Sequence, residues 1–278
     1  MKVSLPMFTV LAGVLLVAAS SAADDPTSST SDEDATAARP AVTGLHATFD
    51  ALLRAHVRDG VVDYRGLVSQ REELSEYLAA LAEASLSQAT RQETLAFWIN
   101  AYNAFTLELI VERYGTIDSI KDIASSRRWT DERWRAAGRK LSLDQIEHEI
   151  LRKMGEPRIH FTIVCASKSC PDLRAEAYVA ERLEEQLDDA TKGFLSDRRK
   201  GLRTATESGF FGGQDFNVYL SRIFDWFEDD FEKGGGSVLR FVEQHAPYDA
   251  QTYMREHADD LDVEWLDYDW TLNDAPAK

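Results

Sequence analysis

The chain has 278 residues, of which 48 are Asp or Glu and 31 are Lys or Arg, giving a formal charge of −17. A surface of this sign repels phosphate groups, which disfavours binding to nucleic acid or to an anionic membrane. Two cysteines and the one histidine near them do not make the usual closed zinc site, and no C-x-x-C spacing is present. The common nucleotide, metalloprotease and serine hydrolase motifs are also absent from the sequence. We therefore predict no metal ion and no cofactor.

The N-terminal residues predict export. In residues 1–22, Lys2 precedes the apolar stretch FTVLAGVLLVAA, which is too short to span a bilayer and ends in small residues. This pattern favours a signal peptide over an uncleaved anchor. Residues 23–41 are polar and acidic, which predicts a disordered tether. No later stretch predicts a membrane span, so we expect a secreted or periplasmic protein with one globular domain over 42–278.

Apolar residues at helical spacing predict helices in the first half of this domain. The stretches GLHATFDALLRAHV (44–57) and EELSEYLAALAEAS (72–85) both show this spacing. Between them, DGVVDYRGL (59–67) interrupts the pattern with two glycines. We expect a short extended segment at the interruption.

The stretch TRQETLAFWINAYNAFTLELIVERYG (90–115) predicts a central helix. Thr90 and Glu93 have the spacing of a capping box. The residues that follow are almost all apolar, which is typical of a helix that is buried on every side. Asn100 and Asn103 then project from one face into the interior. Their amides either bond to the backbone of a neighbouring segment or line a pocket.

The second half mixes helical and extended segments. In 159–165, Ile159, Phe161 and Ile163 alternate with His160 and other residues, which predicts a strand covered from both sides. Helices are predicted over 141–155, 178–195 and 221–231, and further extended segments over 214–220 and 263–273. The sequence thus predicts an α+β fold, a mostly helical single domain with a small β-sheet and a buried central helix.

Cys165 and Cys170, the two cysteines of the chain, allow three interpretations. In an exported protein, two cysteines suggest a disulfide that would pin the turn after the predicted strand. Alternatively, one sulfur is a nucleophilic thiolate, which requires a base within reach. His160 and His148 are the candidate bases, although strand alternation points His160 away from Cys165. The third interpretation is plain buried sulfur.

Five stretches of the chain carry a resemblance to a known family. They are FWINAYNAFTLELI, SLDQIEHEILR, PRIHFTIVCASKSCPDLR, LSRIFDWFEDDF and LDYDWTLN. In this order they resemble the domain of unknown function 547 family over nearly all of the chain beyond the tether. The resemblance marks as motif positions Trp98, Asn100, Tyr102, Asn103, His148, His160, Cys165 and Cys170. The family implies no established activity.

Two functional hypotheses follow from these residues. A cysteine accompanied by histidines and asparagines is the residue set of thiol hydrolases and acyl transferases. In that hypothesis Cys165 is the nucleophile of an exported enzyme that acts on a small amide or thiol substrate. His160 or His148 is the base, and Asn100 or Asn103 orients it or binds an oxyanion. The alternative is a non-catalytic module that binds a small molecule or a protein and contains a structural disulfide between Cys165 and Cys170.

Overall fold

The computed structural model describes residues 44–208 and 212–276, so the predicted signal peptide and acidic tether lie outside the described residues. The α-helices are α1 (Ala47–His56), α2 (Tyr64–Ser69), α3 (Arg71–Glu83), α4 (Arg91–Val111), α5 (Ser125–Arg128), α6 (Leu183–Ser196), α7 (Arg222–Trp226), α8 (Glu228–Gly235), α9 (Val238–His245) and α10 (Tyr248–Glu256). Shorter turns are η1 (Ile120–Asp122), the π-helical η2 (Gln145–Leu151), η3 (Arg152–Met154), η4 (Pro157–Phe161) and η5 (Ala180–Arg182).

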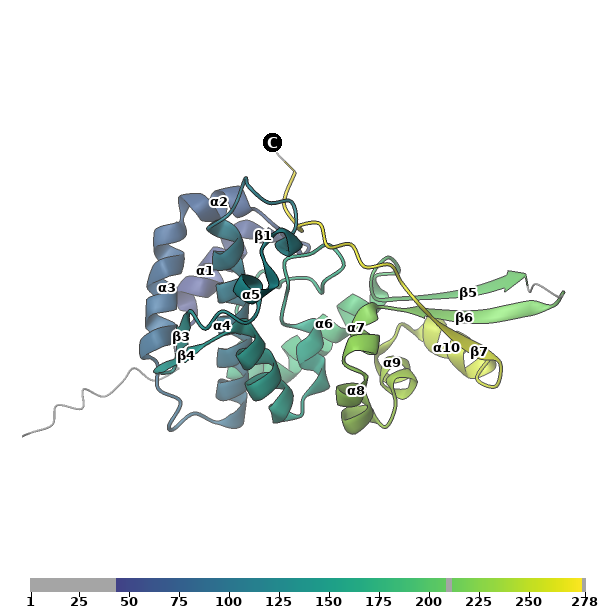
Figure 1. The fold of residues 1–278 in the computed structure, drawn as a ribbon. Helices are drawn as coiled ribbons and strands as arrows, with labels where there is room; N and C mark the ends of the chain where they lie inside the picture. The colour runs from purple at the N-terminus through teal and green to yellow at the C-terminus, as the bar shows by residue number, and fades with distance from the viewer. Residues whose placement is uncertain (1–43, 209–211, 277–278) are drawn as a thin grey trace, which may run out of the picture. The chain divides into compact units, whose positions relative to one another are not determined.

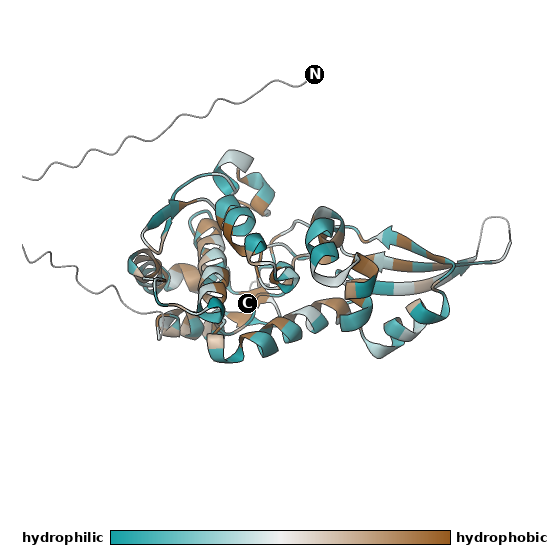
Figure 2. Ribbon diagram, turned by 90° about the horizontal axis from the view of Figure 1, so that it is seen from below, coloured by the Kyte–Doolittle hydropathy of each residue, from teal (hydrophilic) through white to brown (hydrophobic). Residues whose placement is uncertain are grey.

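The strands are few and short. β1 (Val57–Arg58) pairs with β2 (Val61–Val62), and β3 (Trp134–Ala136) pairs with β4 (Arg139–Leu141). The largest described sheet has the order β5 (Leu202–Ser208), β6 (Gln214–Leu220) and β7 (Leu261–Trp265), with β7 parallel to β6. The predicted α+β fold is confirmed, but its strands form separate small sheets. Figure 2 shows hydrophobic and hydrophilic stretches alternating along the outer helices.

Helix α4 runs through the middle of the helical part of the fold in Figure 1. The predicted capping box is present, because the Glu93 amide donates to the Thr90 hydroxyl at 3.2 Å and the Thr90 amide donates to the Glu93 carboxylate at 2.7 Å. Every residue from Leu95 to Val111 is buried. The sequence prediction of a helix covered on all sides is therefore confirmed.

The predicted strand over 159–165 is wrong. Its first half is the 3₁₀ turn η4, which begins with Pro157 and is capped by the Glu156 carboxylate. The segment still lies between two cores, since Ile159 packs in the core around α4 and Phe161 packs in the core of α6 to α10. A buried 3₁₀ turn directs apolar side chains into the cores on both of its sides, as a buried strand does. The alternating pattern therefore does not distinguish a 3₁₀ turn from a strand here.

Two of the predicted helices differ in detail from the structure. The helix over 141–155 is a π-helical turn followed by a 3₁₀ turn, with reciprocal bonds between Ser142 and Gln145 at its start. The helix over 221–231 begins after Ser221 as predicted, but it breaks at Phe227 into α7 and α8. The break separates Trp226 from the buried Phe231.

The predicted extended tail is strand β7 followed by a long irregular segment. In Figure 1 this segment, drawn in yellow, runs from β7 back across the fold toward β1. It bridges to Ser167, Ser119 and Val62 on the way. Asn273 ties the segment to the region around β1, because its side chain accepts from the buried Tyr64 hydroxyl at 2.9 Å and donates to the Gly60 carbonyl at 3.0 Å.

We predict that Asn273→Ala lowers the free energy of unfolding by about 2 kcal/mol, because the buried Tyr64 hydroxyl and the Gly60 carbonyl lose their partner. Thr271→Ala is the control, since Thr271 is exposed and lies in the same segment. Urea unfolding of both variants measures the difference. Equal midpoints for the two variants would contradict this role of Asn273.

Candidate functional site

Both cysteines line a cavity of about 220 Å³. Its walls come from distant parts of the chain, namely α4, η2, η4, the loop that carries both cysteines (residues 162–171, the cysteine loop), α7 and the segment after β7 (residues 266–276, the C-terminal segment). The residues that carry its chemistry are Tyr102, Asp144, Glu147, His148, His160, Cys165, Cys170 and Tyr268. Four of the predicted site residues, both cysteines and both histidines, therefore meet at one cavity.

Cys165 has several hydrogen-bond donors around its sulfur. The hydroxyls of Ser167 and Tyr268 lie 3.1 and 3.4 Å from Sγ. A hydrogen bond with the Cys170 thiol is the largest cause that lowers the pKa of Cys165, and it outweighs burial to bring this pKa to about 6. At neutral pH the half-buried Cys165 is mostly a thiolate, the reactive form of cysteine.

The pKa of Cys170 is shifted in the opposite direction. Burial is the largest cause that raises this pKa well above the ordinary thiol value, and the hydrogen bond with Cys165 raises it further. The Cys165 amide donates to the Cys170 sulfur at 2.9 Å, so the two residues are neighbours, as the sequence predicts. Both cysteines are free thiols in the structure, and no disulfide joins them.

The backbone of the cysteine loop is held in an uncommon conformation. Ala166, directly after Cys165, has a φ of +60°, which non-glycine residues adopt at an energetic cost. The C-terminal segment maintains this turn, because the Asn273 amide donates to the Ala166 carbonyl at 3.1 Å and the Lys168 amide donates to the Thr271 carbonyl at 2.9 Å. Strained backbone conformations that the surrounding structure maintains in this way are concentrated at functional sites in proteins.

The two buried asparagines of α4 form hydrogen bonds to the backbone of neighbouring segments. Of the two roles considered from the sequence, backbone bonding and pocket lining, the structure shows the first. The Asn103 side chain donates to the Thr162 carbonyl at 2.8 Å and accepts from the Val164 amide at 3.0 Å. Asn100 makes the same pair of bonds to the carbonyl and amide of Tyr178, at 2.8 and 2.9 Å. Neither asparagine lines the cysteine cavity, and neither forms a hydrogen bond to an imidazole in the described residues, so neither is placed to orient a base or to bind an oxyanion.

A chain of charged hydrogen bonds fixes the two histidines. Asp230 accepts from His160 Nε2 at 2.9 Å and from Arg152, and these bonds outweigh burial to hold the pKa of Asp230 well below its usual range. A carboxylate only accepts, so Nε2 of His160 carries the hydrogen. Arg152 also donates to His148 Nδ1 at 2.9 Å, so this ring, like that of His160, carries its hydrogen on Nε2.

His160 is therefore a neutral base. Burial is the largest cause that lowers its pKa, while Asp230 acts in the opposite direction. Among residues 44–208 and 212–276, no hydrogen bond is formed to Nδ1 of His160, and none joins an imidazole to either sulfur. The interpretation of Cys165 as a nucleophile requires a base within reach, and the described residues contain no hydrogen bond between a sulfur and an imidazole, although both imidazoles line the cavity with Cys165.

Glu147 is a second titratable group that the sequence analysis did not select. Burial raises its pKa, and its carboxyl accepts from the Tyr102 hydroxyl at 3.0 Å. Glu147, Asp230 and Tyr268 all lie within stretches that carry the resemblance, namely SLDQIEHEILR, LSRIFDWFEDDF and LDYDWTLN. They were not selected, because acidic residues are common in this chain and a tyrosine in a predicted extended tail does not by itself indicate a site.

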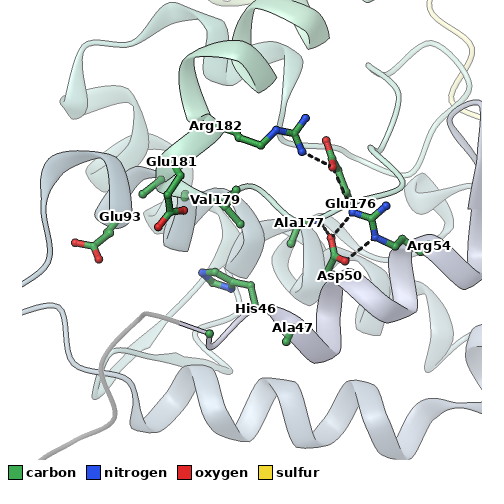
Figure 3. A pocket seen from close by; sticks show the side chains of 13 residues that line it. His46, Ala47, Asp50, Arg54, Glu93, Glu176, Ala177, Val179, Glu181 and Arg182 are labelled. Atoms are coloured by element: carbon green, nitrogen blue, oxygen red, sulfur yellow. Dashed lines mark hydrogen bonds and ion pairs between the residues drawn. The ribbon is translucent and has the colours of Figure 1, made fainter.

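A second cavity, of about 340 Å³, lies beside α1 and is shown in Figure 3. It contains no cysteine, and several of its charges are paired with one another, including Arg54 with Asp50 and Arg182 with Glu176. His46 is neutral at pH 7, because burial lowers its pKa to about 4. This cavity lacks a nucleophile, so the cysteine cavity is the stronger candidate for chemistry.

Two features are absent from the described residues. No group of three or more His, Cys, Asp or Glu side chains in 44–208 and 212–276 is arranged to hold a metal ion. No helix in the described ranges has the length and apolar character needed to cross a bilayer.

Residues 86–195 match the family described as "Protein of unknown function, DUF547", and this segment is a domain of that family. The match includes α4, both histidines and both cysteines of the site. Tyr268, Asp230 and the other resembling stretches near the C-terminus lie outside it. No curated protein and no solved structure matches the chain.

We predict that Asn103→Leu lowers the free energy of unfolding by about 3 kcal/mol, because the buried Thr162 carbonyl and Val164 amide lose their partner. Gln92→Leu is the matched control, since Gln92 is exposed on the first turn of α4. Denaturant unfolding gives both values. Comparable stability of the two variants would show that the backbone finds other partners.

We also predict that alkylation of Cys165 by iodoacetamide increases with pH around a midpoint near 6, well below the ordinary thiol pKa of about 8.5. Tyr268→Phe removes a donor to the thiolate, so its midpoint should rise by about one pH unit. Tyr248→Phe, at an exposed tyrosine, should leave the midpoint unchanged. A midpoint at or above the ordinary value in the unmodified protein would refute the assignment.

Proposed function

We propose that this protein, which contains a DUF547 domain, is an exported cysteine-dependent hydrolase or acyl transferase that acts on a small amide or thiol-containing substrate. The observation that carries the proposal is the environment of Cys165. Its thiolate is stabilised by neighbouring thiol and hydroxyl groups at the wall of a cavity that also contains a buried acid and a neutral base. A group of this kind attacks acyl carbons without first transferring its proton to a base.

The first chemical step forms a thioester. The Cys165 thiolate attacks the acyl carbon of the substrate, and the bond from that carbon to the leaving nitrogen or sulfur breaks. Glu147, whose pKa is raised by burial, donates its proton to the leaving group. The step leaves an acylated Cys165, a Glu147 carboxylate and the released amine or thiol.

The second step removes the acyl group. Water, or an acceptor amine or thiol, attacks the thioester while His160 Nδ1 accepts its proton, and the carbon–sulfur bond breaks to restore the thiolate. Asp230 holds the ring through Nε2 and stabilises the imidazolium that forms. The proton then passes from His160 to Glu147 through solvent. In this one cavity the pKa of Glu147 is raised and the pKa of His160 is lowered, which favours Glu147 as the acid and His160 as the base.

A matched pair of chromogenic substrates tests these roles. p-Nitrophenyl acetate releases a phenolate that needs no proton, whereas the corresponding p-nitroanilide releases an amine that does. We predict that Cys165→Ala abolishes turnover of both substrates. Glu147→Gln should slow the anilide by about 10²-fold or more and leave the ester nearly unchanged, because general acid catalysis matters only for the amine.

His160→Gln provides the second half of this test. Loss of the base for the second step should make the acyl-enzyme accumulate, which mass spectrometry detects as an acetyl group on Cys165. Turnover of both substrates by Cys165→Ala would contradict the proposal. Absence of any acylation of Cys165 in the unmodified protein would favour the non-catalytic binding module instead.

A further inference from the structure

We propose that the substrate of this site carries an alkylammonium group and that an aromatic wall of the cavity binds it. The aromatic wall consists of Trp226 from α7 with Tyr268 and Trp270 from the C-terminal segment. This inference rests on the proposed function, because it names the chemical class of the same substrate. The binding that it describes does not require catalysis.

The three rings of the aromatic wall are in mutual contact. The centroid of Trp226 lies 4.9 Å from that of Tyr268 and 5.7 Å from that of Trp270, and the last two are 4.5 Å apart. Trp226 remains 45% exposed although it lines the cavity. A large ring that is left partly uncovered beside a cavity is available to a ligand.

Charged groups around the cavity favour a cation. Asp144 and the Cys165 thiolate are the anionic groups of its lining, since Glu147 carries the proton that the proposed first step uses, and no lysine or arginine of the described residues lines the cavity. His160 is held neutral by burial, and Arg152, which lies outside the lining, is paired with Asp230. The charges of the lining therefore favour a cationic ligand over an anionic one.

The aromatic rings near the cavity already attract cations of the protein itself. The Lys121 ammonium lies 5.0 Å from the centroid of Trp270, and the guanidinium of Arg128 lies 5.2 Å from that of Trp129. Trp226 has no such partner among the described residues. The negative face of an aromatic ring binds ammonium groups, including the quaternary ammonium groups of ligands. The ring of Trp226 can therefore bind the ammonium group of a ligand.

The position of the wall matches the chemistry proposed for Cys165. Tyr268 belongs to the wall and also lies 3.4 Å from the Cys165 sulfur, so an ammonium group on the wall is a short distance from the nucleophile. The cavity of about 220 Å³ holds an alkylammonium together with a short acyl chain. We therefore expect the charged group and the acyl carbon to belong to one small molecule.

Calorimetric titration with choline and dimethylbutanol tests the inference. Dimethylbutanol is the uncharged isostere of choline, so any difference reports the charge alone. We expect choline to bind about tenfold more tightly than dimethylbutanol. Cys165→Ala should bind choline with at most a few-fold loss, which separates this test from the test of catalysis.

Two variants locate the binding. Trp226→Leu and Asp144→Asn should each weaken choline binding several-fold without weakening dimethylbutanol binding equally, and both are at partly exposed side chains. Tyr248→Leu is the control for an exposed aromatic residue outside the cavity, and it should change neither affinity. Equal affinity for choline and dimethylbutanol, binding of neither, or tighter binding of butyrate than of choline would overturn the inference.

Discussion

Burial of α4 from Leu95 to Val111 is the constraint on which the site depends. A side-chain amide that is buried without a partner is costly, so Asn100 and Asn103 are stabilised by partners inside the protein. Each binds the backbone in two places, Asn100 at Tyr178 and Asn103 at Thr162 and Val164. The bonds of Asn103 satisfy backbone groups that a neighbouring strand would otherwise satisfy. They fix the position of the chain directly before Cys165. The polar groups of the core thus position Cys165, and they form no hydrogen bond to its sulfur.

The cysteine loop is held from its other side by the C-terminal segment. Asn273 binds Ala166 through its backbone amide, while Tyr268 reaches the sulfur of Cys165 with its hydroxyl. Donors from a thiol and two hydroxyls stabilise the thiolate, so an imidazole is not required for this purpose. His160 is consequently free to serve another step, and Asp230 keeps its tautomer fixed. In the mechanism that we propose, this arrangement separates activation of the nucleophile from proton transfer to and from the substrate.

The sequence predicted the parts of the fold that depend on local pattern. Helical spacing, the capping box at Thr90 and the burial of Asn103 all follow from neighbouring residues, and all are confirmed. The strand over 159–165 was wrong because its backbone partner is the Asn103 side chain, a contact between distant residues that no periodic pattern encodes. Asp230 and Tyr268 were missed for the same reason, since they reach the site from segments 70 and 103 residues away from their partners.

The central claim is that Cys165 is a free thiolate beside a protected Cys170, and brief labelling of the native protein tests it most directly. The protein is isolated without reductant, exposed to a maleimide at neutral pH, and analysed by mass spectrometry before and after unfolding. The account predicts one label in the native protein, located on Cys165, and a second on Cys170 only after unfolding. No label in either state would show that the cysteines form a disulfide and would contradict the account.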